Sequence, residues 1–317
     1  MIAKYFAPLS AGAPGAFGLQ DDVATLLLPE GQELVAKVDA IVEDVHFFRD
    51  DPADLIAKKA LRVNLSDLAA KGAAPIGYLL SLSLAPWAGD DWVGEFARGL
   101  AEDQAQFGIH LLGGDTTATP GVLTVSITAL GSIAAGKTIR RAGAQVGDLV
   151  FVTGSIGDAG AGLAVLKGEG GSLSKVDRAA LIARYRVPEP RLAFGRLLPG
   201  FASASLDISD GLIADLGHIA EVSKVLIAVD AARIPLSSSL AAIWGNGIDA
   251  VVRAVTAGDD YEIAFTAPPA ARAAVGAAVR ETGLPVTEIG VVGTGEGVVL
   301  LDNGKPVPVP HSGYTHF

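Results

Sequence analysis

Strand and helix signals alternate along this 317-residue chain, and the alternation starts twice. The first series runs from a β-branched, apolar segment at residues 34–42 to another at residues 122–131, with helical patterns between them. A second series begins with the apolar run at residues 149–152. Alternating strands and helices pack in layers around a buried sheet. Two such series, divided by a glycine-rich stretch at residues 136–147, predict two mixed α/β domains of similar size.

Periodicity within the series predicts the individual elements. Leu61, Leu65 and Leu68 recur on one face of a helix that should stop near Gly72, and residues 92–107 show the same helical spacing. Short alternating or continuous apolar runs predict the strands. Beyond those named above, we predict strands at 78–85, 225–230, 261–267 and 286–292, and helices at 157–168, 178–186, 190–198, 210–223 and 269–283.

The stretch GSIAAGKT, residues 131–138, matches the phosphate-binding pattern G-x-x-x-x-G-K-[ST] at every position. This pattern binds phosphate where a strand leads into the loop and a helix leaves it. A strand is predicted before the loop, but Gly143, Gly147 and the strand at 149–152 leave too few residues for a mean helix of about 11. We therefore predict that the glycine-rich turn connects two strands or leads from one domain into the next, and a P-loop NTPase stays the less favoured alternative function.

Composition limits the partners and the chemistry. The net charge of −11 and the sequence pI of about 4.9 disfavour nucleic acid and anionic membranes as partners. A phosphorylated ligand stays open, because a divalent cation can join acid to phosphate. The chain has no cysteine, which excludes thiol nucleophiles and thiolate metal sites. It shows neither a signal-peptide pattern nor a run of 18 apolar residues, so we expect a soluble cytoplasmic protein.

Aspartates gather at the ends of predicted strands and beside glycines. Aspartate is common in turns and at helix N-caps, and Asp210 is a candidate N-cap for the helix that follows it. If several of these carboxylates converge, two charges 4 Å apart repel by about 4 kcal/mol at an effective dielectric constant of 20. Mg²⁺ suits such an all-oxygen site, and the five histidines lack zinc-hydrolase spacing. The residues alone indicate a magnesium-dependent enzyme acting on phosphates.

Nine motifs, in order along the chain, resemble those of the thiamine-monophosphate kinases, a family of the aminoimidazole-ribonucleotide-synthetase-like superfamily. The most specific are NLSDLAA at 64–70, GGDTT at 113–117 and DISDGL at 207–212. The others are QDDVA, KVDAIVEDVHFF, RRAGAQVGDLVFVTGSIGDAGAGL, VPEPRLAFG, AGDDYEIAF and the terminal GYTHF.

The resemblance implies a two-lobed α/β fold and a kinase reaction. Residues 1–140 would form an N-terminal domain that binds ATP and Mg²⁺ and pairs its sheet with that of a second subunit in a homodimer. Residues 141–317 would form a C-terminal α/β domain that closes the active-site cleft. ATP, the co-substrate, would phosphorylate thiamine monophosphate to thiamine diphosphate with the help of several Mg²⁺ ions. A non-catalytic nucleotide- or metal-binding relative of the same fold is the alternative.

The resemblance also implies roles for individual residues, each of which has an ordinary structural explanation as well. Arg141 is otherwise a surface arginine, His46 a partly buried histidine, and Tyr314 a packing residue near the end of the chain. The implied ATP contacts are Gly114, Asp115, Arg141 and Ser209, and the implied substrate contacts are His46, Asp259 and Tyr314. The implied magnesium ligands are Asp22, Asp39, Asp67, Asp115, Asp207 and Asp210.

The chain departs from the family pattern in two places. Lys37 and Val38 stand where the family has Ser-Thr before the aspartate that is Asp39 here. The loss of two hydroxyl groups and the gain of a positive charge predict fewer bound metal ions than the family maximum. Asp259 stands where the family has glutamate, and its side chain is one methylene shorter.

Overall fold

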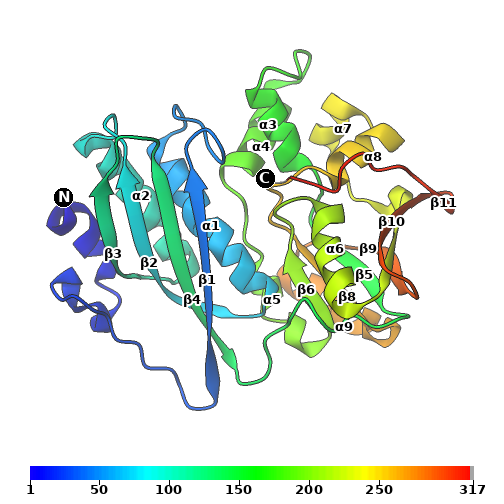
Figure 1. The fold of residues 1–317 in the computed structure, drawn as a ribbon, viewed down its shortest axis with the longest axis horizontal. Helices are drawn as coiled ribbons and strands as arrows, with labels where there is room; N and C mark the ends of the chain where they lie inside the picture. Colours follow the sequence, from blue (N-terminus) through cyan, green and yellow to red (C-terminus); the bar gives the residue numbers. More distant parts are fainter. Residues whose placement is uncertain (315–317) are drawn as a thin grey trace. The chain divides into compact units, whose positions relative to one another are not determined.

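The computed structural model describes residues 1–314, so the terminal Thr-His-Phe of the GYTHF motif lies outside the described residues. Contacts divide the chain into two compact units. The N-terminal unit comprises residues 1–68 and 73–138, and the C-terminal unit comprises residues 69–72 and those from 139 onward. Figure 1 shows the elements of both units. The predicted functional division between residues 140 and 141 stays a prediction.

The N-terminal unit is a four-stranded sheet with two long helices. The strand order is β1-β4-β2-β3, in which β2 and β3 are parallel and the other two pairs are antiparallel. Three short turns of helix precede the sheet: η1 (Ile2–Phe6), η2 (Ala7–Ser10) and η3 (Pro14–Leu19). The remaining elements are β1 (Gln32–Val42), α1 (Ala53–Ala70), β2 (Ala74–Leu84), α2 (Asp90–Phe107), β3 (Leu111–Ala118) and β4 (Thr124–Ala134).

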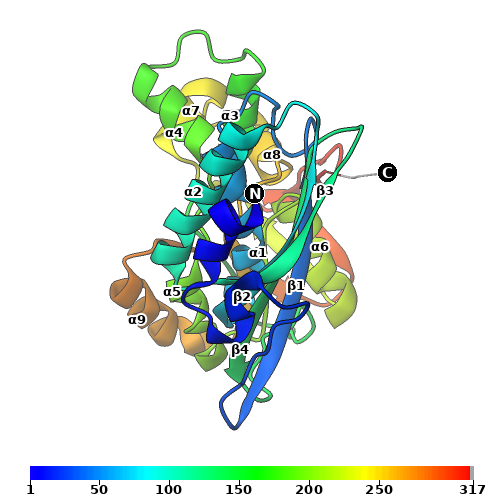
Figure 2. The ribbon, with the colours of Figure 1, turned by 90° about the vertical axis from the view of Figure 1, so that its left-hand side faces the viewer.

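Both helices cover the same face of this sheet (Figures 1 and 2). Strand β4 shows why, because its residues alternate between a buried and a partly exposed face. Val125, Ile127 and Ala129 are buried on the helix side, while Thr128 and Leu130 face the other way. Along β1 the outward positions include Leu34 and Val38, which are about half exposed. One face of the sheet therefore forms the core, and the other face is open.

The glycine-rich segment after β4 is a turn, and no helix follows it before residue 149. The main chain of Lys137 donates to the carbonyl of Ala134 within that turn. The carboxylate of Glu33 accepts from the N–H of Gly136 at 3.2 Å and from the hydroxyl of Thr138 at 2.5 Å. The predicted strand connection is confirmed. Donors that a P-loop would offer to phosphate serve an acid of the chain itself, so the P-loop alternative is wrong.

The C-terminal unit is a seven-stranded sheet, in the order β11-β10-β7-β9-β5-β8-β6, with helices on both faces. Its strands are β5 (Leu149–Thr153), β6 (Ala204–Asp207), β7 (Leu226–Asp230), β8 (Ile263–Ala267), β9 (Val286–Gly293), β10 (Gly297–Asp302) and β11 (Lys305–Pro306). Its helices are α3 (Asp158–Leu166), α4 (Lys175–Arg186), α5 (Leu192–Gly195), α6 (Leu212–Ser223), α7 (Ser238–Trp244), α8 (Ile248–Val255) and α9 (Arg272–Thr282). Short 3₁₀ turns lie at η4 (Leu198–Gly200), η5 (Ala231–Arg233) and η6 (Pro269–Ala271).

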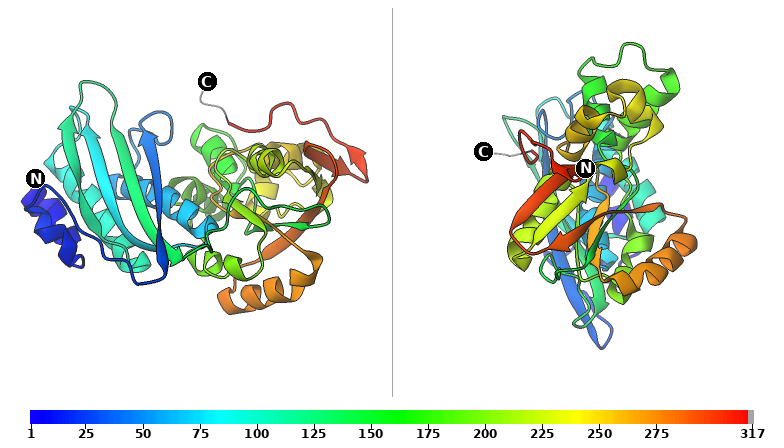
Figure 3. Two further views of the ribbon diagram at one scale, coloured as in Figure 1. Left: turned by 60° about the horizontal axis from the view of Figure 1, so that its bottom comes forward. Right: turned by 90° about the vertical axis from the view of Figure 1, so that its right-hand side faces the viewer.

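Alternation along β5 builds two cores in this unit. Val150 and Val152 belong to a large apolar cluster with residues of α6 and α8. Phe151 points the other way and stacks on Phe265 of β8, with ring centroids 5.1 Å apart. Helices α6 and α9 accordingly lie on opposite sides of the sheet (Figures 2 and 3).

The prediction of two mixed α/β lobes is confirmed. Within residues 1–314, every helix is too short or too polar to cross a membrane.

Candidate functional site

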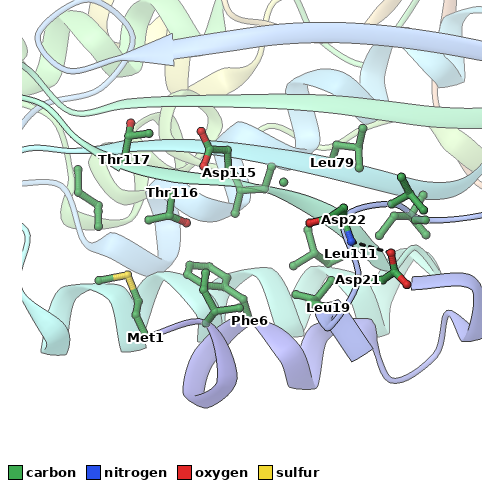
Figure 4. A pocket seen from close by; sticks show the side chains of 18 of the residues that line it. Met1, Phe6, Leu19, Asp21, Asp22, Leu79, Leu111, Asp115, Thr116 and Thr117 are labelled. Carbon is green, nitrogen blue, oxygen red and sulfur yellow. Dashed lines mark hydrogen bonds between the residues drawn. The ribbon is translucent and has the colours of Figure 1, made fainter. Parts of the chain in front are cut away.

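Asp22 and Asp115 line one cavity of about 730 Å³ in the N-terminal unit. Asp115 projects from β3, and Asp22 comes from the chain that follows η3 (Figure 4). The N–H of Asp22 donates to the carboxylate of Asp21 at 2.7 Å, which brings a second acid to the same wall. Apolar side chains, including Phe6, close the opposite side. The cavity therefore joins acidic oxygen atoms to an apolar surface of a size suited to a small ligand.

Gly114 lets β3 lie close to β2 at the wall of this cavity. Its φ is 153°, and a Cβ atom built there would lie 1.8 Å from the carbonyl oxygen of Leu80 on β2. Any side chain would push β3 away from β2, so glycine is required immediately before Asp115. The position of the Asp115 carboxylate thus depends on the residue before it.

Asp39 and Asp67 are joined by Lys37. The Lys37 Nζ lies 3.1 Å from Oδ1 of Asp39 and 2.9 Å from Oδ2 of Asp67. Burial acts to lower the pKa of Lys37, but the negative charges of Asp67 and Asp39 and their hydrogen bonds outweigh it and raise the pKa well above its usual range. The lysine is therefore a permanent cation between the two acids.

The four acids of the N-terminal unit fall into two groups. Asp39 shares a cross-strand row with Ile127 and Leu80, which are buried under the helices. Asp115 belongs to the next row, beside Ser81. Three strand spacings of about 4.8 Å each separate β1 from β3, or about 14 Å. The structure thus brings together Asp39 with Asp67, and Asp22 with Asp115.

His46 follows β1 in a turn that fixes its ring. The N–H of Val42 donates to Nδ1 of His46 at 3.1 Å. An accepting Nδ1 carries no proton, so the neutral ring has its proton on Nε2. The buried ammonium of Lys59 donates to the His46 carbonyl at 2.8 Å and holds the main chain of the turn.

In the C-terminal unit, the predicted site residues follow β6. Asp207 is the last residue of that strand and is buried. The main chain then turns sharply, and one carboxylate oxygen of Asp215 accepts the N–H groups of Ser209, Asp210 and Gly211 at 3.0, 3.0 and 3.1 Å. Asp215 therefore holds the loop that carries Ser209 and Asp210.

Asp210, the candidate N-cap of the helix that follows it, does not cap α6. Gly211 occupies the N-cap and no side chain caps the helix there. The Asp215 carboxylate, one turn inside the helix, supplies the acceptor instead. An N-cap side chain accepts from N–H groups that follow it in the sequence. The Asp215 carboxylate instead accepts from N–H groups that precede it.

Asp210, Asp215 and His218 each offer a ligand atom within 4.8 Å of the others. Burial, and next the charge of Asp210, raise the pKa of Asp215 from 3.8 to about 7, although the three N–H groups act to lower it. Sequence reasoning did not single out Asp215 or His218. The usable signal was their spacing of three residues on a predicted helix, which places both on one face.

Main-chain hydrogen bonds join the loop before β8 to the loop after β6. The N–H of Asp259 donates to the carbonyl of Ser209, and the N–H of Tyr261 donates to the carbonyl of Ile208, both at 2.8 Å. Asp259 and Tyr261 both have left-handed backbone, with φ of 69° and 50°. At Gly258 a Cβ atom would lie 2.6 Å from the Ser209 carbonyl, so the close approach requires glycine.

Two buried acids beneath this loop were also missed. Asp260 is fully buried and accepts the N–H groups of Gly157 and Ala159 at the start of α3. Glu262, also fully buried, binds the guanidinium groups of Arg184 and Arg191. These hydrogen bonds and ion pairs hold the loop before β8 in place. The sequence around Asp260 and Glu262 is that of an acidic turn, so it does not reveal that both side chains are buried.

Two further predicted residues lie in this unit. The N–H of Tyr314 donates to the carbonyl of Asp210 at 2.9 Å, which docks the C-terminal segment on the Asp207–Asp210 loop. Arg141 is exposed, and its carbonyl accepts from the hydroxyl of Ser223 at 3.4 Å. The C-terminal unit therefore gathers Asp207, Ser209, Asp210, Asp259 and Tyr314 at adjoining loops.

Comparison with known proteins assigns both units. The family described as AIR synthase related protein matches with its N-terminal domain at residues 20–133 and its C-terminal domain at residues 145–303. Thiamine-monophosphate kinase of Caulobacter vibrioides is 42% identical over 99% of this chain and 89% of its own length.

Solved structures agree over nearly the whole chain. The thiamine-monophosphate kinase of Stenotrophomonas maltophilia K279a is 38% identical with a TM-score of 0.86, covering 96% of this chain and 98% of its own. AaThiL complexed with AMPPCP and TMP is 32% identical with a TM-score of 0.79, covering 96% and 97%.

Proposed function

The chain belongs to the thiamine-monophosphate kinase family of AIR synthase related proteins, and we propose that it transfers the terminal phosphoryl group of ATP to thiamine monophosphate. The products are thiamine diphosphate and ADP. The observation that carries this proposal is the match, across both units, to AaThiL complexed with AMPPCP, an ATP analogue, and TMP. The chain acts in the cytoplasm, where ATP is the phosphoryl donor.

Mg²⁺ fits part of the acidic set. Asp22 and Asp115 in the cavity, and Asp207 and Asp210 after β6, present the carboxylate oxygen atoms that Mg²⁺ prefers. When bound there, the ion offsets the negative charge of the two phosphorylated substrates. Asp39 and Asp67 fit a divalent ion less well, because an ammonium group already lies between their oxygen atoms.

The protein residues bind and orient two anions. Gly114 and Asp115, with Arg141 and Ser209, form the proposed contacts to ATP. The Arg141 guanidinium opposes the phosphate charge, and the Ser209 hydroxyl is held by the Asp215-bound loop. Positioning and charge stabilisation are the main requirements of phosphoryl transfer.

Thiamine monophosphate is bound through His46, Asp259 and Tyr314. The accepting Nδ1 of His46 places the proton of the neutral ring on Nε2, and an N–H is the kind of group that donates to a phosphate oxygen. That phosphate is largely ionised at neutral pH, so its oxygen attacks phosphorus directly and in line, without a general base or a phosphorylated enzyme.

A homodimer is part of the proposal. The open face of the N-terminal sheet exposes Leu34, Val38 and Leu79, which are 49%, 57% and 39% exposed. Apolar side chains exposed on an open sheet face mark a surface that gains from burial against a partner. A second copy of the same sheet is the proposed partner.

The test uses the full chain with Mg²⁺, ATP and thiamine monophosphate, and measures thiamine diphosphate. Free thiamine is the control acceptor and should give no product. Asp67→Asn removes an acid that holds the Lys37 cation at the site and should abolish turnover, whereas Asp54→Asn, on the same helix and paired with Arg98, should leave it intact. The same loss is expected for Asp210→Asn. Near-normal rates for either site variant at saturating Mg²⁺ would refute the assignment of that acid, and no product with wild type would favour a non-catalytic relative.

A further inference from the structure

The Lys37 ammonium occupies a defined position between two carboxylates. It contacts Asp39 on its own strand at 3.1 Å and Asp67 on α1 at 2.9 Å. The side chain of Asp67 is only 15% exposed, and that of Lys37 is 30% exposed. The lysine thus lies where β1 runs beside α1 (Figure 1). The side chain of Asp39 is 39% exposed, so the three groups form a partly buried cation site.

The local fold fixes all three groups. Lys37 and Asp39 are two residues apart on a strand, so both side chains lie on the face toward α1. Asn64, fully buried and one turn before Asp67, accepts the N–H of Asp39 on Oδ1 at 2.9 Å. Its Nδ2 donates to the carbonyl of Ala60 at 3.0 Å, which fixes the amide in that orientation. Asn64 therefore holds β1 against α1 at the point where the charges meet.

An ammonium and a divalent ion compete for this place. Mg²⁺ binds carboxylate oxygen at 2.0–2.1 Å and surrounds itself with six ligands. An ion that took the same two oxygen atoms would lie next to the ammonium, and the two like charges would repel in a partly buried setting. One cation, and not both, therefore suits the pair.

We propose that Lys37 acts as a built-in cation that replaces one divalent ion between Asp39 and Asp67. The chain then binds fewer divalent ions than its set of aspartates would allow, and one positive charge at the site never dissociates. This proposal rests on the proposed kinase function for its role in catalysis, where the ammonium helps offset phosphate charge. The cation replacement itself stands on the geometry alone.

Metal counting on the full chain, without nucleotide, tests the replacement. Mn²⁺ binding is followed by the electron paramagnetic resonance signal of the free ion. Lys37→Ser removes the charge and introduces a hydroxyl. It should bind about one more Mn²⁺ per chain than wild type, because carboxylates without a counter-charge attract a divalent ion. Lys37→Arg keeps a cation and should bind the wild-type number.

The matched control is Lys58→Ala. Lys58 pairs with Glu102 at 2.5 Å in the same unit, so its removal also leaves a carboxylate without its lysine. No additional Mn²⁺ is expected there. In the Lys37→Ser background, Asp67→Asn should remove the additional ion. Equal Mn²⁺ counts for wild type and Lys37→Ser would overturn the proposal.

A second measurement needs no variant. Acetylation of wild-type Lys37, quantified by mass spectrometry against the exposed Lys137, should proceed at the same rate with and without Mg²⁺. A rise on adding Mg²⁺ would show that the ion displaces the ammonium, and the proposal would fail. Thiamine diphosphate formation, measured on the same preparation, separates the two ideas. A chain that makes no product but shows the expected Mn²⁺ counts refutes the kinase function and leaves the cation replacement standing.

Discussion

Asp215→Asn should change how stability depends on pH. The wild-type carboxyl is 1% exposed and is surrounded by the loop that it holds. Burial and the charge of Asp210 raise its pKa from 3.8 to about 7. The folded chain therefore binds this proton more tightly than the unfolded chain does.

The sign and size follow from proton linkage. A raised pKa adds stability that is fully present below pH 3.8 and is lost as the pH rises through about 7. At 1.36 kcal/mol per pKa unit, the difference between 3.8 and about 7 corresponds to about 4 kcal/mol. Asparagine does not titrate, so the stability of the variant relative to wild type should rise by about that amount between about pH 4 and about pH 8.

Urea denaturation in the presence of a metal chelator measures this difference. Trp244 lies in the C-terminal unit, so a background with Trp87→Phe and Trp92→Phe reports on that unit by fluorescence. A difference between variant and wild type that stays flat across the pH range would refute the reasoning.

Asp177→Asn is the control of opposite sign. Hydrogen bonds from Ser174 and Ser239 lower the pKa of Asp177, so its contribution is present above its unfolded pKa and is lost as the pH falls. Its variant should therefore lose stability relative to wild type as the pH rises to about 4, with a nearly constant difference above about pH 5. The same sign for both variants would show that a general charge effect, and not the burial of Asp215, governs the result.

Three further outcomes are expected. Asp103→Ala should lower the free energy of unfolding by about 3 kcal/mol or more in urea, because it leaves the buried Arg62 guanidinium without its bidentate partner; a loss below about 1 kcal/mol would contradict this. His46→Ala should raise KM for thiamine monophosphate about tenfold, the equivalent of one hydrogen bond to a charged phosphate, and unchanged KM would count against that contact. Lys137→Ala should leave kcat and KM unchanged in the thiamine diphosphate assay, and a large loss would revive a phosphate role for the glycine-rich turn.

Much of the fold could be predicted because local patterns are strong where elements are long. The helix expected to stop near Gly72 is α1, which ends at Ala70, and the strand expected at 34–42 is β1, which begins two residues earlier, at Gln32. Strand β6, the helix pair α7 and α8, and strands β10 and β11 were not predicted. They are short, and β6 and β10 pair with strands that lie far away in the sequence.

The sequence names candidate acids for the site, but it does not show how the fold arranges them. The motif strings name Asp39 and Asp67, and the departure at Lys37 indicates a positive charge nearby. The contact with Asp39 is local, but nothing local places the ammonium 2.9 Å from Asp67, because that contact joins a strand to a helix 30 residues later. Asp215 was missed because its role depends on the shape of the loop before α6, whose N–H groups donate to its carboxylate.

The left-handed backbone at Asp259 offers a physical reason for an aspartate where the family pattern has the longer glutamate. With φ at 69°, the residue lies in a region where aspartate is several times more common than longer side chains, because a short carboxylate can bond to its own main chain. A glutamate there would extend further but would tolerate the bend less well, at a strain of about 1 kcal/mol. The shorter acid thus suits the left-handed backbone of this loop, and the proposed role of Asp259 in substrate binding requires a ligand that lies closer to the loop than a glutamate would need.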